Sequence, residues 1–370
     1  MKVCFFGAYY CKYGFNPLIR GLERNNVEIV DCFVAPSKFI PYSFRQLFFF
    51  FIATLVRYIK LCVKHSHIKD YDVMIVAWPA FYDVLLGKIL SKLRRKSLVY
   101  YAFLSHYNTQ IFDREYEKKS FKIALKAKLF YLYDRIPCKL ADLILLDTQV
   151  HIDYFVKTFR LPQEKFRRLF VGASSNVFQP QESQKANKFM VIFFGRFIPL
   201  HGIKYIIQAA DLLKNYRNIK FRIVGKGQTK KENLRLAKKL RLTNIDFVDY
   251  LFPEELAIVT AKADIGLGIF GETNKAKKVI PHKIFDLMAM KKSIITGDSP
   301  AVREILTDKK NVILCKMANT KSLAESILLL KNNRQLREKI SVNAYNLFKK
   351  KFTRKKIGEE LKDILEELTT

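Results

Sequence analysis

The residues best suited to chemistry lie in one segment of the second half, 279–295, which reads V-I-P-H-K-I-F-D-L-M-A-M-K-K-S-I-I. Pro281 is typical of the first turn of a helix, where free N–H groups and the positive dipole end favour a bound pyrophosphate. Lys283 adds positive charge there, and Asp286 places a carboxylate in an otherwise apolar helix. This order predicts a nucleotide-sugar pocket, against the alternative of a partly exposed helical aspartate without a ligand.

Two glycine turns follow predicted strands in the same half. Gly195 and Arg196 precede F-I-P-L-H-G, and Gly225 and Gly227 flank a lysine after a second strand. Glycine allows close approach of the backbone, and arginine can clamp phosphate oxygens with two parallel hydrogen bonds. The alternatives are an arginine that caps a strand end and glycines that serve an ordinary tight turn.

In the first half, the polar run S-H-Y-N-T at 105–109 follows a predicted strand and is followed by Asp113 and Arg114. Titratable side chains at the mouth of a parallel sheet are where catalytic groups are expected. We therefore take His106, Asp113 and Arg114 as candidate catalytic residues. The alternative for the histidine is a surface or structural role.

The elements that must position these residues form two alternating series of apolar runs and helical patterns, which predicts α/β domains with doubly wound parallel sheets. The polar stretch after Phe178 predicts a linker between the two domains. We expect a first domain at 1–178, a second at 187–352 and a terminal helix at 353–370. The predicted strands are Lys2–Phe6, Val27–Phe33, Val73–Val76, Leu98–Tyr101, Leu143–Leu146, Phe189–Phe194, Phe221–Val224, Ile245–Phe247, Ile265–Ile269, Ser293–Thr296 and Val312–Leu314.

Composition limits the class of protein. With 370 residues, 49% of them apolar, the chain is long enough for two cores. Its 66 Lys and Arg against 34 Asp and Glu give a net charge of +32, which attracts polyanions such as nucleic acid or an anionic membrane face. Six scattered cysteines without a C-x-x-C pair, and a start without signal-peptide features, predict a cytosolic protein with no metal site.

The longest apolar run, Leu47–Val56, has ten residues, whereas crossing a bilayer takes roughly 20. It continues with Arg57, Lys60 and Lys64 at helical spacing, which predicts a basic amphipathic helix that lies in a membrane interface. A helix packed on a sheet with solvated lysines is the alternative.

These segments together resemble retaining glycosyltransferases of the GT-B class, family 4, also called glycosyl transferase group 1. In that family P-x-K-x-x-E-x-M-A-x-G-x-P-V-I recurs, and a G-R-x-x-x-x-K-G element corresponds to Gly195–Gly202. The resemblance implies a GT-B fold, with two Rossmann-like domains facing each other across a cleft. It also implies a C-terminal helix that crosses back to pack on the N-terminal domain.

The resemblance also assigns donor-binding roles. Arg196 and Lys283 would hold the donor diphosphate together with the helix at Pro281, and Asp286 would take the place of the glutamate that binds the ribose hydroxyls. The remaining donor-binding positions implied by the family are Gly7, His201, Gly225 and Gly227. His201 stands where the family has lysine, and Lys278 stands where it has the first glutamate of a pair, so the identity of the sugar is in doubt.

The implied activity is metal-independent transfer of a sugar from a nucleoside diphosphate to a hydroxyl acceptor, without a cofactor. In this family retaining transfer is generally attributed to front-face attack, which needs no protein nucleophile. Acceptors such as surface glycans, lipopolysaccharide or glycolipids imply a cytoplasmic protein on the inner face of the cytoplasmic membrane. Two other readings are a non-catalytic relative, suggested by His201, Lys278 and Asp286, and a nucleic-acid-binding protein, suggested by the basic run 349–356. Because no nucleic-acid recognition motif accompanies the charge, no nucleic-acid partner is expected.

Overall fold

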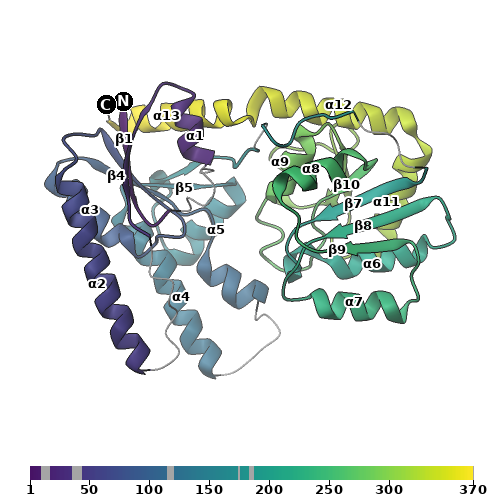
Figure 1. Ribbon diagram of the computed structural model, residues 1–370, viewed down its shortest axis with the longest axis horizontal. Helices are drawn as coiled ribbons and strands as arrows, with labels where there is room; N and C mark the ends of the chain where they lie inside the picture. Colours follow the sequence, from purple (N-terminus) through teal and green to yellow (C-terminus); the bar gives the residue numbers. More distant parts are fainter. Residues whose placement is uncertain (10–16, 36–43, 115–120, 174–175, 183–186, 370) are drawn as a thin grey trace.

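The computed structural model describes residues 1–9, 17–35, 44–114, 121–173, 176–182 and 187–369, without the side chains of 44–51, 114 and 121–122. Figure 1 shows two halves, each built on one β-sheet with helices on both of its faces. Every strand pair in both sheets is parallel. This is the two-domain α/β GT-B architecture that the sequence predicts.

The sheet of the first half has the strand order β2-β1-β3-β4-β5-β6. Its last strand was not predicted from the sequence, because it is only three residues long and two of them are exposed arginines at the sheet edge. The strands are β1 (Lys2–Gly7), β2 (Glu28–Phe33), β3 (Val73–Ala77), β4 (Ser97–Tyr101), β5 (Leu143–Leu146) and β6 (Phe166–Arg168).

The sheet of the second half has the order β12-β11-β10-β7-β8-β9. All of its strands match predicted strands. Phe189–Phe194 is almost fully buried and continuously apolar, as expected of a strand covered on both faces, whereas the edge strand Ile245–Val248 is only half-buried. They are β7 (Phe189–Phe194), β8 (Ile219–Val224), β9 (Ile245–Val248), β10 (Ile265–Leu267), β11 (Ser293–Gly297) and β12 (Ile313–Cys315).

Helices cover both faces of the first sheet. One face packs against residues such as Leu61, Val84, Cys138 and Phe155, which come from four different helices and form one core with the strands. The helical segments of this half are α1 (Pro17–Glu23), α2 (Phe44–Ser66), α3 (Asp83–Leu93), the π-helix η2 (Asn108–Arg114), α4 (Phe121–Leu140), α5 (Gln149–Phe159) and η3 (Gln163–Lys165).

The second half repeats this layered arrangement. Its helical segments are η4 (Pro199–His201), α6 (Ile203–Leu212), α7 (Lys230–Lys239), α8 (Pro253–Ala261), α9 (His282–Ala289), α10 (Pro300–Arg303), α11 (Thr320–Asn332) and α12 (Arg334–Lys351). The chain then turns at Phe352 and enters α13 (Arg354–Thr369), the terminal helix.

Helix α13 crosses back to the first half and packs on α1, as Figure 1 shows. The two helices touch at glycines: a Cβ added to Gly21 would lie 3.0 Å from the Cα of Gly358. An apolar stripe of α13 faces the first half, with Ile357, Leu361 and Leu365 buried in the same core as α1. The crossing of the C-terminal helix is therefore confirmed.

Helix α2 differs from the predicted amphipathic helix at one residue. Arg57 does not belong to the solvent-facing basic side, because it is buried and forms a two-point ion pair with the fully buried Asp83 at 2.6 Å. Arg57 lies four residues before the core residue Leu61 in α2, so the two side chains share one face of the helix. Helical spacing alone therefore could not assign Arg57 to the solvent-facing side. Among helices in the described ranges, none has the length and apolar character needed to cross a membrane.

Candidate active site

Two glycine turns interlock at the carboxyl ends of β7 and β8. Gly195 and Gly225 have φ of 142° and 139°, and a Cβ on Gly225 would collide with the carbonyl oxygen of Gly195. Only glycine combines that backbone with so close an approach. Gly227 packs in the same way, since its Cβ would lie 2.6 Å from the carbonyl of Phe197. The two turns therefore form one unit that holds the exposed Arg196.

Lys283 lies in the first turn of α9 and is buried, with its Nζ 3.7 Å from the ring centre of Phe193. A Cβ on Gly195 would come within 2.9 Å of this Nζ. Within the described part of the chain, the Nζ has no hydrogen-bond partner. Burial holds the pKa of Lys283 well below its usual value, and the charge of Asp286 opposes this shift. A buried cation without a partner is costly, so this geometry suits an anionic ligand.

His201 holds the turn that carries Arg196. Its Nδ1–H donates to the carbonyl of Arg196, and its ring packs edge-on against Phe193. This hydrogen bond places a proton on Nδ1, so Nε2 is an acceptor in the neutral imidazole. His201 is thus placed beside the predicted donor residues, and its own contact with a donor stays a prediction.

Pro281 lies one position earlier in the helix than expected. Helix α9 begins at His282, and Pro281 is the N-cap residue with an extended ψ of 141°, so no side chain caps the first turn. The uncapped N–H groups of that turn remain suited to an anion. Asp286 follows one turn later, buried, with its Oδ2 3.8 Å from the Nδ1 of His282.

The first half reaches this region through η2. Thr273 donates to the carboxylate of Asp113 at 3.2 Å, and the Nζ of Lys275 donates to Thr109 at 2.6 Å. Asp113 is fully buried, and η2 also touches η4, the turn that contains His201. The structure therefore brings the predicted catalytic residue Asp113 against the second half. Arg114 ends η2, and its side chain lies outside the described residues.

His106 is fixed by its backbone. Its N–H donates to Asp134 at 2.9 Å, while the same carboxylate accepts from the Ser105 hydroxyl at 2.6 Å. Burial, with a smaller contribution from Lys275, lowers the pKa of His106 to about 4, so its imidazole is neutral at pH 7. Burial raises the pKa of Asp134 to about 7 against these hydrogen bonds. Sequence reasoning missed Asp134, whose only signal is a lone acid in a helix rich in lysine.

Gly7 ends β1 with a φ of 94°, and a Cβ there would collide with the carboxylate of Asp83. The same carboxylate accepts from the N–H of Ala8 at 2.8 Å. Gly7 is therefore required for the packing of the β1 turn on α3. A contact between its N–H and a donor remains a prediction.

Lys278 points to the first half. Its Nζ lies 4.0 Å from the ring centre of Tyr154, and its carbonyl accepts from the Thr148 hydroxyl at 2.6 Å. Burial lowers the pKa of Lys278 to about 8. Thr148 also caps α5 by accepting from the N–H of His151, the role that its sequence context predicts. Lys278, which stands where the family has a glutamate, is thus part of the contact between the halves.

Glu304 joins the halves in a way that sequence reasoning missed. Its carboxylate accepts from the N–H groups of Gln149 at 2.9 Å and Val150 at 3.0 Å, which open α5 in the other half. Arg168 adds an ion pair at 3.5 Å. No local signal could reveal this cap, because donor and acceptor are 155 and 154 residues apart.

We expect Glu304→Ala to speed hydrogen exchange at the amides of Gln149 and Val150 by about fivefold, because losing a cap costs on the order of 1 kcal/mol. Exchange measured by mass spectrometry checks this. Glu338→Ala, which removes an exposed pair with Arg334 at 2.6 Å, is the matched control and should leave these amides unchanged. Equal exchange in both variants would show that the cap does not hold the halves together.

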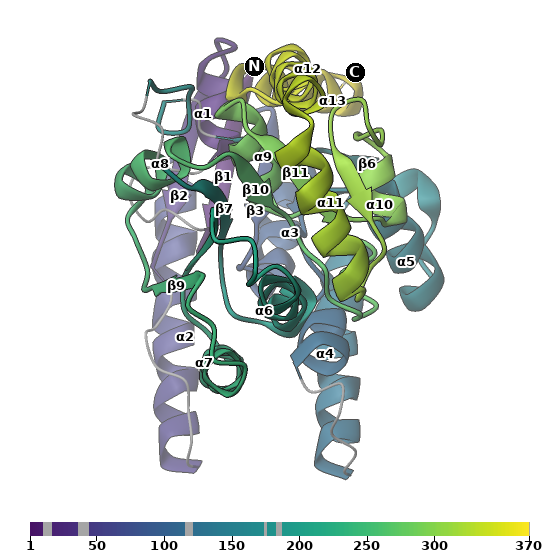
Figure 2. The ribbon, with the colours of Figure 1, turned by 90° about the vertical axis from the view of Figure 1, so that its right-hand side faces the viewer.

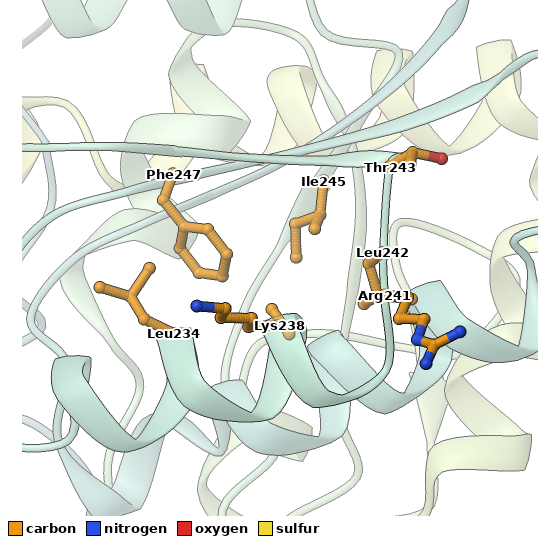
Figure 3. A pocket seen from close by; sticks show the side chains of 8 residues that line it. Leu234, Lys238, Arg241, Leu242, Thr243, Ile245 and Phe247 are labelled. Carbon is orange, nitrogen blue, oxygen red and sulfur yellow. The ribbon is translucent and has the colours of Figure 1, made fainter.

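One hollow lies away from these residues. It has a volume of about 470 Å³ and is lined by α7 and the edge strand β9 (Figure 3). Its lining consists of Leu234, Ala237, Lys238, Arg241, Leu242, Thr243, Ile245 and Phe247. None of the predicted donor or catalytic residues is among them, so we do not assign this hollow to the candidate site.

Comparisons with known proteins find similar sequences and similar folds. Residues 175–347 match the family model of glycosyl transferases group 1. The alpha-D-kanosaminyltransferase of Streptomyces kanamyceticus is 24% identical over 304 residues, which cover 78% of this chain and 74% of that protein. The chitobiosyldiphosphodolichol beta-mannosyltransferase of Candida albicans is 27% identical over 224 residues, or 54% and 48% of the two chains.

Solved structures show the same fold. The Anabaena protein HepE in complex with UDP-glucose superposes with a TM-score of 0.71 at 17% identity, over 99% of this chain and all of that one (100%). Sucrose-phosphate synthase from Thermosynechococcus elongatus gives a TM-score of 0.75 at 12% identity, over 99% and 98% of the two chains. At these identities the likeness shows the fold alone.

The fold, the family match and the relatives define the class: this chain is a glycosyltransferase with the GT-B fold. Residues 175–347 are the part of the chain that is similar to the glycosyl transferases group 1 family.

Proposed function

We propose that the protein transfers a sugar, with retention of anomeric configuration, from a nucleoside diphosphate to a hydroxyl acceptor in surface glycan, lipopolysaccharide or glycolipid synthesis. The observation that carries this proposal is the buried ammonium of Lys283, without a hydrogen-bond partner among the described residues, beside Gly195 at the start of α9. A diphosphate would supply the missing partner, and the uncapped helix start would supply further N–H donors.

In this proposal the residues have separate tasks. Arg196 and Lys283 neutralise the charge that develops on the leaving diphosphate, which is the largest electrostatic demand of the reaction. Asp286 accepts hydrogen bonds from the ribose hydroxyls. His106 and Asp113 lie on the acceptor side and orient the attacking hydroxyl, so the gain comes from positioning and needs no covalent intermediate. Because cationic groups carry the leaving-group charge, we infer that no metal or cofactor is required.

The two donor residues are tested first with labelled UDP-, GDP- and ADP-sugars and mass-spectrometric detection of bound nucleotide. UDP-glucose is the first choice, since HepE is described with that ligand. We expect Arg196→Ala and Asp286→Ala each to lower donor turnover by about 10- to 10²-fold, because each removes a charged hydrogen-bond partner worth about 1.5–3 kcal/mol. If none of the three donors binds the unaltered protein, the proposal fails.

A non-catalytic relative is the second candidate, favoured by Lys278 at the position of a family glutamate and by its contact with Tyr154. The same donor assay separates the two. Turnover by the unaltered protein that is lost on Arg196→Ala excludes the non-catalytic reading, whereas binding without turnover supports it.

The acceptor class also implies a location. Acceptors that are lipid-linked glycans or lipopolysaccharide cores are held at the inner face of the cytoplasmic membrane, and we propose peripheral association with that face. The net charge of +32 supports this part of the proposal, since anionic lipids attract basic proteins.

A further inference from the structure

Three neighbouring helices on one face of the first sheet carry apolar rows on their outer sides. Their inner sides fill one core with the sheet, through residues such as Leu61 in α2, Val84 in α3 and Cys138 in α4. Rows at helical spacing then face solvent: Ile52, Leu55, Val56, Ile59 and Val63 in α2, Leu85, Ile89 and Leu93 in α3, and Leu125, Leu129, Leu132 and Ile136 in α4. We call these twelve residues the apolar rows.

The side chains of the apolar rows are largely exposed and do not belong to the core. Leu55 is 62% exposed, Leu93 is 76% exposed and Leu125 is 65% exposed. Single exposed apolar residues are ordinary on protein surfaces, but adjoining rows on neighbouring helices mark a surface that binds something. A helix needs only one apolar stripe to pack on a sheet, so the second stripe on each helix has no purpose within the described fold.

The exposed charged side chains of the three helices that carry the apolar rows, where described, are all positive. The only acids in α2, α3 and α4 are Asp83 and Asp134, and both are buried. The exposed charged residues of these helices with described side chains are Lys60, Lys92, Lys126, Lys128 and Lys139. An apolar surface whose own helices expose only cations among their described side chains is complementary to lipid with anionic headgroups, because acyl chains accept the apolar side chains and phosphates accept the lysines.

The direction of α2 and α4 adds to this argument. Each begins after the carboxyl end of a strand, β2 or β4, the edge of the sheet at which Gly7 and His106 lie. Figures 1 and 2 both show α2 and α4 extending downward beyond the rest of the first half. A lipid layer that contacts α2 and α4 would thus lie close to the side of the sheet where the acceptor is proposed to enter.

We propose that the outer face of α2, α3 and α4 docks on an anionic lipid bilayer. The apolar rows enter the region between headgroups and acyl chains, and the bordering lysines contact lipid phosphates. This surface rests on the proposed peripheral association and names the residues that carry it, but it depends on neither the donor nor the chemistry of transfer. It also replaces the narrower expectation of a single basic helix, because α3 and α4 contribute as much exposed apolar surface as α2.

Flotation with vesicles tests the docking surface in the full-length protein. We expect binding to mixed phosphatidylglycerol and phosphatidylcholine vesicles and little binding to phosphatidylcholine alone. The double variant Leu85→Gln with Ile89→Gln should weaken the partition into mixed vesicles by about tenfold or more, because each side chain buries apolar area on insertion. These residues are 56% and 52% exposed, so the fold should not depend on them, which a thermal unfolding scan checks.

The matched control is Leu212→Gln with Ile258→Gln in the second half, where both residues are 54% exposed. It should bind vesicles as the unaltered protein does. A charge variant, Lys92→Glu with Lys126→Glu, should lose binding to the mixed vesicles, and added salt should weaken the binding of the unaltered protein.

Three results would overturn the proposal. The first is equal vesicle binding by the α3 variant and its control. The second is binding that ignores both anionic lipid and salt. The third is self-association by light scattering that the α3 variant abolishes while vesicle binding persists, which would assign the apolar rows to a second copy of the chain. The vesicle tests do not involve a sugar donor, so they remain interpretable even if the protein binds none. The docking surface and the proposed sugar transfer can therefore fail independently.

Discussion

Replacing Lys283 with methionine is expected to abolish donor binding and at the same time to stabilise the fold. The buried ammonium costs free energy in the unbound protein, and packed apolar atoms in its place should raise the free energy of unfolding by about 1–4 kcal/mol. The variant loses the charge that meets the diphosphate, so donor turnover should fall by about 10²–10³-fold. Thermal unfolding and donor turnover, measured on the same sample, check that stability rises while turnover falls.

Lys277 provides the control, since it is an exposed lysine in the loop just before α9. Lys277→Ala removes the same formal charge but should change neither stability nor donor turnover appreciably. If Lys283→Met destabilises the protein, or if it binds donor as well as the control does, the buried ammonium is not the diphosphate contact.

The same residue gives donor binding a pH dependence. Burial lowers the pKa of Lys283 in the free protein, and a bound diphosphate raises it again, so binding takes up a proton. Affinity is therefore greatest below the pKa of the free protein and falls as the pH rises toward the pKa of the complex. Calorimetry in buffers with different ionisation enthalpies measures the proton uptake, which Lys283→Met should remove.

The second large effect is expected at Asp83. Asp83→Ala leaves the buried guanidinium of Arg57 without its partner and should lower the free energy of unfolding by about 3–5 kcal/mol. It also leaves the N–H of Ala8 without an acceptor, which loosens the turn at Gly7. Urea unfolding measures the loss through a lower midpoint.

Two comparisons isolate the cause. Asp298→Ala removes an exposed two-point pair with Arg303, at 2.6 and 2.7 Å, and should cost less than about 1 kcal/mol. The double variant Arg57→Met with Asp83→Leu should recover much of the stability, because no unpaired charge stays buried. A double variant as unstable as Asp83→Ala would mean that lost packing, rather than the unpaired arginine, causes the effect.

The sequence predicts the sheets well because parallel strands buried on both faces are continuous apolar runs. It fails at β6, where Arg167 and Arg168 face solvent and hide the strand. It also fails at Arg57, since an arginine in a helix with apolar faces is ordinarily solvated. Arg57 is buried because Asp83 in α3 pairs with it, and β6 forms because it lies at the edge of the sheet, where its arginines can face solvent.

For the candidate site, residue types and spacing predict Lys283 and Asp286, but burial and missing partners need the fold. The interaction of Glu304 with α5 could not be predicted, because nothing near residue 304 indicates a helix start 154 residues away. The outer row of α3 shows the same difficulty. Leu85, Ile89 and Leu93 have the spacing of a core-facing stripe, and only the buried Val84, Gly87 and Ser91 reveal which side faces the sheet.

The crossing of α13 has a consequence for synthesis. The first half is made early, but α1 is covered by residues 354–369, which are made only after the whole second half. Until α13 has been made, the apolar residues of the first half that share a core with Ile357 and Leu361 remain uncovered, which exposes the nascent chain to aggregation. The N-terminal half therefore completes its fold only after α13 has been made, and a stop codon placed before residue 354 should yield insoluble protein.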